Sequence, residues 1–312
     1  MEITAAMVKE LREVTGAGMM DCKKALGETE GDLEKAIEYL RENGKAQAQK
    51  KAGRIAAEGI VMLKVTDDEK KAVAVEVNSE TDFVAKNEKF RSYVAQVAEQ
   101  ALETGAADID AFLAEPWKFE EGKTVQDALE SEIAIIGENM HIRRFEKTEA
   151  ANGFVSAYTH MDGKIGVLIN VESDVVNDAV KEMGKNIAMQ AAAMRPTYCH
   201  ASEIPGDFIE KETEILRATI MNDPEESKKP ENVIEGMVKG RINKELKEIV
   251  LMDQVYVKAE DGKQSVAKYV EQVAKENGAN IAIKSFVRFE TGEGLEKKNE
   301  DFAAEVAAQA AQ

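Results

Sequence analysis

Cysteine, histidine and tryptophan are scarce in this chain of 312 residues, which contains two, three and one of them. Cys22 and Cys199 lie far apart in the sequence, and Cys22 falls within a helical pattern, so we expect no structural disulfide and a reducing compartment. The histidines show no zinc-ligand spacing relative to the cysteines, and we therefore predict no metal site. The three histidines are His141, His160 and His200.

Long hydrophobic runs are also missing. No stretch of about 18 apolar residues occurs, which excludes a transmembrane helix and predicts no membrane partner. Residues 1–13 carry acids and lysines where a signal peptide would have an apolar run. Together these absences predict a cytoplasmic protein.

Basic residues are outnumbered, with 41 Lys and Arg against 59 Asp and Glu, and the net charge is −18. This acidic excess argues against direct nucleic-acid binding, which needs a basic footprint. It keeps the protein soluble, and it can also steer the chain toward a partner with a basic surface. Composition leaves both roles open.

Signatures of catalysis are largely absent. The sequence has no glycine-rich phosphate loop. Residues 16–18, Gly-Ala-Gly, lack a third glycine and follow a helical pattern, so they indicate a helix end rather than a dinucleotide site. Glu80 and Asp82 suggest a carboxylate pair, but acids in turns more often face solvent or cap helices. We therefore predict no cofactor, no nucleotide site and no enzymatic activity.

What is present is a periodic apolar pattern within a strongly charged chain. Charged residues make up 32% of the sequence, yet Val, Ile, Leu and Ala recur in periodic blocks, which excludes wholesale disorder. The length suffices for about two domains with sizeable cores. We therefore expect a multi-domain protein.

The most informative segment is residues 76–86, Glu-Val-Asn-Ser-Glu-Thr-Asp-Phe-Val-Ala-Lys. The alternation over residues 72–78 predicts a strand, which a polar turn at 79–82 ends. Phe83 follows directly, and a helical pattern begins near Asn87. A phenylalanine at such a turn either folds back into the core, which burial statistics favour, or projects as a wedge toward another molecule. The segment itself leaves both readings open.

Residues 1–45 contain three short helical patterns. Thr4 can cap the first helix, which the glycines of residues 15–18 end, and Asp32 can cap the third. The arrangement resembles a compact three-helix bundle of the ubiquitin-associated type. Residues 46–56 are polar and basic, and we interpret them as a linker, with a connecting helix as the alternative.

The middle of the chain contains an internal repeat. A shift of 94 positions places residues 59–79 on residues 153–173 with matching Gly, Val, Asp, Lys and Ser. The repeat predicts two copies of a strand–turn–strand–helix unit, each an antiparallel sheet covered by a helix. We assign the first core subdomain to residues 57–146 and the second to residues 147–290.

The two copies differ at one corner. Residues 81–83 are Thr-Asp-Phe in the first copy, whereas the corresponding residues 175–177 are Val-Val-Asn. The scaffold is therefore duplicated and the phenylalanine is not, which favours a special role for Phe83.

A helical hairpin is predicted within the second copy. Two helical patterns at residues 208–221 and 232–250 are joined by a charged turn with two prolines, which gives an inserted antiparallel pair over residues 208–251. Its apolar stripe packs either against the chain's own core or against another molecule. The stripe consists of Ile234, Val238, Ile242, Leu246 and Ile249.

The remaining sequence returns to mixed structure. A glycine turn at residues 292–294 and a helix capped by Asp301 form a C-terminal helical module, residues 291–312. The elements expected between the hairpin and this module are a strand at residues 256–259, a helix at 265–277 and a strand at 281–289.

Two long motifs, residues 11–26 and 76–86, resemble the signature motifs of the bacterial translation elongation factor Ts family in order and separation. Residues 136–144 and 286–295 are similar to further segments of that family. The resemblance covers essentially the whole chain. It implies an α+β fold with an N-terminal three-helix domain, duplicated core subdomains, an inserted coiled coil and a C-terminal module that lies on a partner.

The resemblance also implies a function. Members of this family are guanine nucleotide exchange factors for elongation factor Tu: they bind its GDP complex, disturb its Mg²⁺ and phosphate site, and promote GDP release so that GTP can bind. The family's exchange wedge corresponds to Thr81, Asp82, Phe83 and Val84. Phe83 would insert between partner helices, and Asp82 would compete in the polar network near the metal.

The resemblance implies further contacts with elongation factor Tu. The hairpin corresponds to a projecting coiled coil that the family uses in self-association or in partner contact, and self-association would give a homodimer or a 2:2 complex. The corresponding partner-binding residues are Arg12, Met19, Met20, Lys23, His160, Met237 and Val238.

Two other classes of function remain open. The first is an adaptor in which residues 1–45 bind another protein without exchange activity and Phe83 is dispensable. The second is a hydrolase that uses Glu80 and Asp82, which would turn over a substrate without any protein partner.

Overall fold

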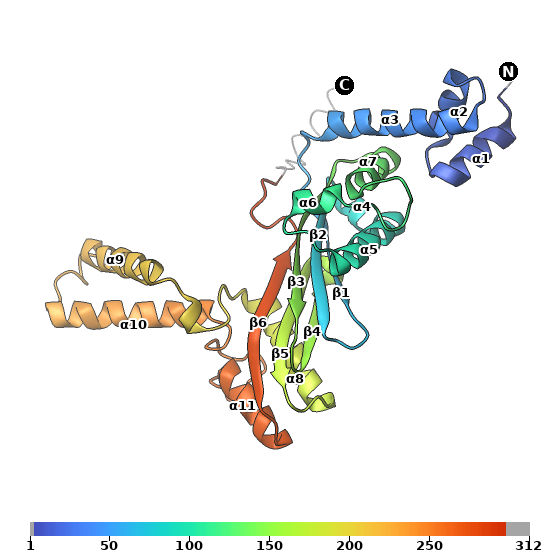
Figure 1. Cartoon of the computed structure of the whole chain (residues 1–312). Helices are drawn as coiled ribbons and strands as arrows, with labels where there is room; N and C mark the ends of the chain where they lie inside the picture. The colour runs from blue at the N-terminus through green and yellow to red at the C-terminus, as the bar shows by residue number, and fades with distance from the viewer. Residues whose placement is uncertain (1–2, 298–312) are drawn as a thin grey trace.

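The computed structural model describes residues 3–297 and shows two three-stranded antiparallel sheets flanked by helices (Figure 1). A helical bundle lies at one end of the molecule, and a helical hairpin projects from the other (Figure 1). The expected α+β class is confirmed. Within the described residues, none of the helices combines the length and apolar composition that a membrane span requires.

The N-terminal bundle follows the capping signals of the sequence. The Thr4 hydroxyl accepts a hydrogen bond from the backbone N–H of Met7, and Asp32 caps the third helix through Lys35. The third helix continues to Lys51, so the first six residues of the segment interpreted as a linker are helical, as the alternative stated. The three helices are α1 (Ala5–Thr15), α2 (Met19–Glu28) and α3 (Leu33–Lys51).

The first sheet has the order β1–β2–β3, and the predicted strand over residues 72–78 is its central strand. Helices α5 and α7 cover its outer face around the buried Phe90 and Phe112. The elements of this half are β1 (Glu58–Val65), β2 (Lys71–Ser79), α4 (Asp82–Ala85), α5 (Glu88–Glu103), α6 (Ile109–Ala114), α7 (Val125–Ile136) and β3 (Met140–Glu149).

The second sheet has the order β4–β5–β6, with α8 and α11 on its outer face. The two sheets pack on each other through an apolar cluster that includes Val61, Ala74, Val155 and Leu168. The elements of this half are β4 (Phe154–His160), the short 3-10 helix η1 (Met161–Gly163), β5 (Ile165–Ser173), α8 (Asp178–Met194), the 3-10 turn η2 (Ala201–Glu203), α11 (Val266–Asn277) and β6 (Ile281–Glu290).

The strand predicted at residues 256–259 is wrong. The segment is a turn next to a single bridge between Val255 and Ser265. Tyr256 is buried because its ring stacks on Tyr269, with centroids 4.1 Å apart, and not because it belongs to a sheet.

The repeat extends from the sequence into backbone geometry. Gly59 and Gly153 both have positive φ, 123° and 105°. A Cβ atom on either glycine would lie 2.1 Å from the carbonyl oxygen of Val77 or Val171, residues that are themselves 94 positions apart. The bulges of β2 and β5 after Glu76 and Asn170 are also 94 positions apart.

The later elements of each half correspond with a larger shift. Helices α7 and α11 begin at Val125 and Val266, 141 positions apart, and both end at a left-handed glycine. The additional 47 positions accommodate the hairpin, whose helices are α9 (Gly206–Asn222) and α10 (Glu231–Ile249).

The hairpin forms a small apolar cluster of its own. Ile220, Ile234 and Val238 are buried between α9 and α10. Ile234 and Val238 of the predicted apolar stripe therefore pack within the hairpin itself. The glycine turn at residues 292–294 is present after β6. The helix expected to start after Asp301 lies outside the described residues.

Candidate partner-contact surface

The turn after β2 is fixed by one carboxylate from a distant part of the chain. Glu138 accepts hydrogen bonds from the backbone N–H groups of Glu80 and Thr81, at 3.1 and 3.0 Å. It also accepts the Thr81 hydroxyl at 2.6 Å, and the Thr81 oxygen caps α4 through the N–H of Val84 at 3.3 Å. The single turn α4 therefore starts from an ordered corner.

Phe83 projects from this corner. Its side chain is 80% exposed, whereas Ala85 of the same helical turn is buried and Val84 packs against the first core. Of the two readings of the sequence, the structure selects the projecting one. Leaving a phenylalanine in water forgoes about 1.5–3 kcal/mol of burial free energy, so the position is consistent with a contact surface.

Asp82 and Glu80 have different partners. Asp82 forms an ion pair with Lys86 at 2.7 Å, and the hydrogen bond from Lys86 lowers the pKa of Asp82 below its ordinary value. Glu80 accepts the N–H of Asn139 at 2.6 Å and pairs with Arg54. The two carboxylates do not form a shared acid–base pair, and the hydrolase alternative loses its geometric basis.

His160 lies close to the same corner. It ends β4, is exposed, and has Nδ1 2.9 Å from the hydroxyl of Tyr158. The next residue, Met161, is 68% exposed, and Asp162 binds Arg91 of α5. Arg91 also donates to the carbonyl of Ala85 in α4, so η1 and the Phe83 corner are joined.

The N-terminal candidates lie on the surface of the bundle. Met19 and Met20 are 61% and 74% exposed, so neither methionine side chain belongs to the core of the bundle. Arg12 of α1 and Lys23 of α2 are also exposed, whereas Cys22, the neighbour of Lys23, is buried. An exposed pair of flexible apolar side chains fits an adaptable contact.

The hairpin candidates differ from each other. Met237 is half-buried at the edge of the hairpin cluster. Val238 is only 6% exposed and packs within the hairpin cluster, and its contact with a partner stays a prediction. The hairpin lies far from α4, at the opposite end of the molecule from the bundle (Figure 1).

A polar latch joins the bundle to the first core. Asp127 binds Arg41 at 3.1 Å and Lys45 at 2.9 Å, both from α3, and completes the capping box of α7 with Thr124. Burial opposes ionisation of Asp127, but the hydrogen bonds from Lys45 and Thr124 and the charge of Arg41 outweigh this effect. The pKa of Asp127 therefore lies well below its ordinary value.

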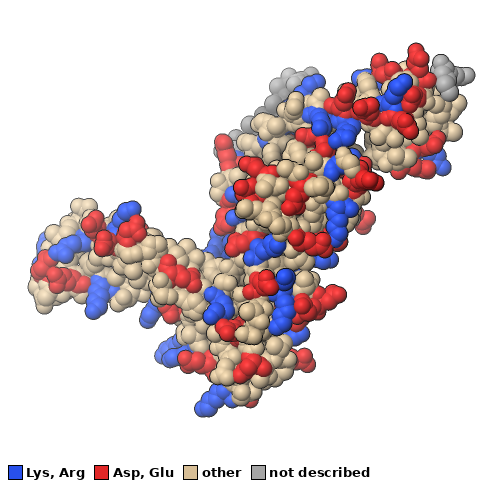
Figure 2. All heavy atoms as spheres, in the orientation of Figure 1, with Lys and Arg blue, Asp and Glu red and all other residues tan. Residues whose placement is uncertain are grey.

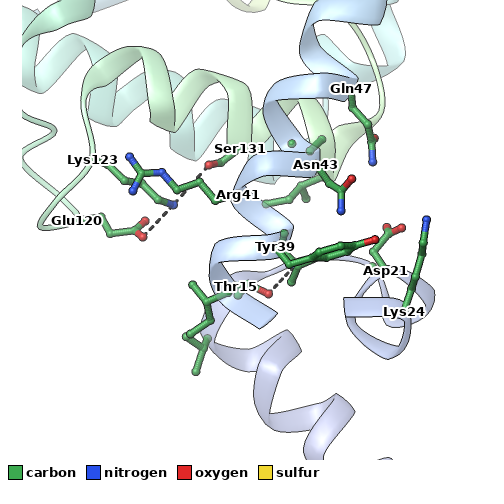
Figure 3. A pocket seen from close by; sticks show the side chains of 18 of the residues that line it. Thr15, Asp21, Lys24, Tyr39, Arg41, Asn43, Gln47, Glu120, Lys123 and Ser131 are labelled. Atoms are coloured by element: carbon green, nitrogen blue, oxygen red, sulfur yellow. Dashed lines mark hydrogen bonds and ion pairs between the residues drawn. The ribbon is translucent and has the colours of Figure 1, made fainter. Parts of the chain in front are cut away.

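Beside the latch lies a cavity of about 350 Å³, in which the Lys123 side chain contacts Ser131 and Glu120 (Figure 3).

One cluster of side chains of the types that bind metal ions was not predicted from the sequence. Cys199, His200 and Glu203 place three ligand-type atoms within 4.8 Å of one another. However, His200 Nε2 lies 2.7 Å from the carbonyl of Ile283, and Glu203 accepts the N–H of Cys199. Burial and the charge of Glu203 raise the pKa of the Cys199 thiol to about 12, and both cysteines are free, so the cluster does not favour a metal ion.

The sequence also missed Glu138, Arg91 and Met161. Their roles depend on contacts with residues distant in the sequence, which the spacing of neighbouring residues does not reveal.

On the face shown in Figure 2, acidic and basic side chains are interspersed, unlike the clustered basic footprint of nucleic-acid-binding proteins.

An exposed aromatic side chain on a fixed turn is typical of a protein that acts through a protein–protein contact surface. A family model described as Elongation factor TS matches residues 80–293. The chain is 50% identical to elongation factor Ts of Clostridium tetani over 304 residues, which cover 97% of this chain and 98% of that protein. It is 51% identical to elongation factor Ts of Clostridioides difficile over 307 residues, 98% of each chain. The chain belongs to the elongation factor Ts family.

Proposed function

We propose that this protein is a cytoplasmic guanine nucleotide exchange factor for elongation factor Tu. It binds the GDP complex of that partner, disturbs the Mg²⁺ and phosphate site, and promotes GDP release so that GTP can bind. The observation that carries the proposal is the 80% exposure of Phe83 on a turn that Glu138 holds in place. Membership of the family supports the identity of the partner.

The physical basis is a difference in affinity. The exchange factor must bind the nucleotide-free partner more tightly than the GDP–Mg²⁺ form, because only that difference lowers the affinity for GDP. Reciprocity then requires that nucleotide weakens binding of the exchange factor, so release follows from the same coupling. No covalent step by this chain is needed.

Each residue of the corner has a role in this proposal. Phe83 inserts between partner helices, and Asp82 competes in the polar network around the metal ion. Thr81 and Val84 fix the corner, through the cap on α4 and through packing on the core. Asp82 is suited to its role because it is charged at neutral pH, as its lowered pKa indicates.

The remaining contacts distribute over the molecule. We assign residues 1–45 to a ubiquitin-associated-like partner-binding domain, the two halves 57–146 and 147–290 to the core, and the hairpin to a coiled coil that supports a homodimer or a 2:2 complex. The predicted C-terminal module, residues 291–312, lies largely outside the described residues, and its contact with the partner stays a prediction. The proposed contacts are Arg12, Met19, Met20 and Lys23 of the bundle, His160 of β4, and Met237 and Val238 of the hairpin.

The test is the release of fluorescent GDP from purified elongation factor Tu. We expect the wild type to accelerate release strongly and Phe83→Ala to lose at least about tenfold of the stimulated rate, which corresponds to about 1.4 kcal/mol of differential binding. Asp82→Ala should lose rate as well. The matched control is Val176→Ala, since Val176 is exposed at the corresponding corner of the second copy, and its rate should be unchanged.

The adaptor remains the second candidate, because the exposure of Met19 and Met20 gives the bundle an apolar surface of its own. Binding of elongation factor Tu without acceleration of GDP release would favour the adaptor. Acceleration that survives both corner substitutions would keep exchange and move its origin to the bundle.

A further inference from the structure

Arg91 connects two parts of the candidate surface that belong to different halves of the chain. Its Nε donates to the carbonyl of Ala85, the last residue of α4, at 3.0 Å. Its Nη1 and Nη2 donate to the two carboxylate oxygens of Asp162 at 3.1 and 2.7 Å, and Nη2 also donates to the Asp162 carbonyl at 2.7 Å. One planar guanidinium thus spans the end of the Phe83 turn and the turn after His160.

The turn that Arg91 holds is conformationally unfavourable. Met161 and Asp162 are consecutive non-glycine residues with positive φ, 48° and 55°. Met161 is nevertheless kept 68% exposed, and Gly163 behind it lies against Ile60 of β1. Strained residues that persist at an exposed position need support from their surroundings, and the bidentate bond to Arg91 supplies it.

The second half of the chain contains a partial counterpart of this arrangement. The N-caps of α5 and α8, Asn87 and Asn177, lie 90 positions apart, so the residue of α8 that corresponds to Arg91 is Lys181. Lys181 forms an ion pair with Glu69, a residue of positive φ, 57°, in the turn between β1 and β2. Within the described residues, however, the Lys181 side chain makes no hydrogen bond to the corner before α8. The feature particular to Arg91 is therefore its additional bond to the end of the Phe83 turn.

We propose that Arg91 is a positioning residue that holds the Phe83 turn and the Met161 turn as one rigid surface for insertion into the nucleotide-binding partner. The inference rests on the proposed exchange function and deepens it. A rigid surface retains its binding energy for displacing partner elements, whereas a mobile phenylalanine would lose part of that energy to ordering on contact. Met161 extends the apolar surface of Phe83 from the second half of the chain.

The test is a double-mutant cycle on the maximal rate of GDP release at saturating exchange factor. Arg91→Gln keeps a polar side chain but cannot bind Ala85 and Asp162 together. We expect a loss of about tenfold in the maximal rate, with the half-saturating concentration little changed. Because Arg91 acts through Phe83, the double variant with Phe83→Ala should be no slower than Phe83→Ala alone. Asp162→Asn should reproduce the loss.

The matched control is Lys181→Gln, which breaks the corresponding helix-to-turn ion pair with Glu69, away from the Phe83 turn, and should leave the rate unchanged. A mainly structural role is separated by two further readouts. The thermal midpoint of Arg91→Gln should fall by no more than about 4 °C, because a partly exposed ion pair contributes little to global stability. Amide hydrogen exchange should accelerate at residues 82–86 and 161–164, and not in the control.

The outcomes separate the two claims. Additive effects of Arg91→Gln and Phe83→Ala, or an unchanged rate in Arg91→Gln, would overturn the brace while the wild type still accelerates release. A wild type that does not accelerate GDP release would overturn the proposed exchange function and the brace with it.

Discussion

At the scale of single residues, Glu76 is the most constrained charge in the described chain. Its fully buried carboxylate accepts from Arg143 at 3.0 Å, Arg144 at 2.6 Å and the N–H of Gly292 at 2.8 Å. These partners come from β3 and from the turn after β6, so one side chain of β2 joins the two halves of the core. A buried charge of this kind is stable only while its partners remain.

We expect Glu76→Gln to lower the free energy of unfolding by about 1.5–3 kcal/mol, because the partly exposed side chains of Arg143 and Arg144 lose the buried carboxylate that accepts their hydrogen bonds. The measurement is urea unfolding at neutral pH. The control is Glu149→Gln, which breaks a largely exposed pair with Lys71 and should cost less than about 1 kcal/mol. A loss below about 1 kcal/mol for Glu76→Gln would show that the halves are held together by apolar packing alone.

The direction of the Phe83 side chain could not be predicted from the sequence, although the elements around it could. The strand before it and the helix after Asn87 were predicted correctly, and Asn87 does cap α5. The direction of the side chain was not predictable, because it depends on Glu138, which lies 57 positions from Thr81 and fixes the corner through three hydrogen bonds. The repeat indicated only that this corner was unusual.

At the scale of elements, local signals predicted most of the secondary structure. Thr4, Asp32 and Ser265 cap the helices expected to follow them, because a capping side chain acts within three residues of itself. The errors arose where tertiary contact decided. Tyr256 is buried by stacking outside any strand, and α3 runs on to Lys51 because it docks on α7.

The α3–α7 latch gives a prediction on pH. The pKa of Asp127 is lower in the folded protein than its ordinary value of about 3.9, so its contribution to stability is fully present above about pH 5. It is lost as the pH falls through the folded value. We therefore expect the stability difference between the wild type and Asp127→Asn to be constant above about pH 5 and to shrink progressively below about pH 4.

The measurement is chemical unfolding across this pH range, together with hydrogen exchange of α3 at neutral pH. Asp178→Asn is the control, since Asp178 is an exposed acid in the first turn of α8 without a latch. Its stability difference from the wild type should be small at every pH. Unchanged protection of α3 in Asp127→Asn would mean that the packing of α3 on α7 holds the bundle without this ion pair.

At the scale of the whole molecule, the proposed contact surfaces are spread from the bundle, across the corner at α4, to the hairpin (Figure 1). The core that separates them is built twice from one plan. The sequence repeat predicted that plan over two strands and a helix, but not the return of α7 as α11, because the inserted hairpin changes the shift from 94 to 141 positions. Insertion between matched elements thus explains both the missed correspondence and the projecting shape.

The same geometry makes the hairpin removable. The chain enters and leaves it at neighbouring points, since the N–H of Tyr198 donates to Ile249 at 3.0 Å and the N–H of Leu251 donates to Tyr198 at 2.8 Å. The apolar residues of α9 and α10 pack mainly on each other, so their loss exposes little of the core. We expect replacement of residues 206–247 by a short Gly-Ser linker to leave the core folded and GDP release accelerated, while self-association is lost. Light scattering after size exclusion reports the mass, and the exchange assay reports activity. A monomeric wild type would remove the role of the hairpin in self-association, and an unfolded variant would show that α9 and α10 are part of the core after all.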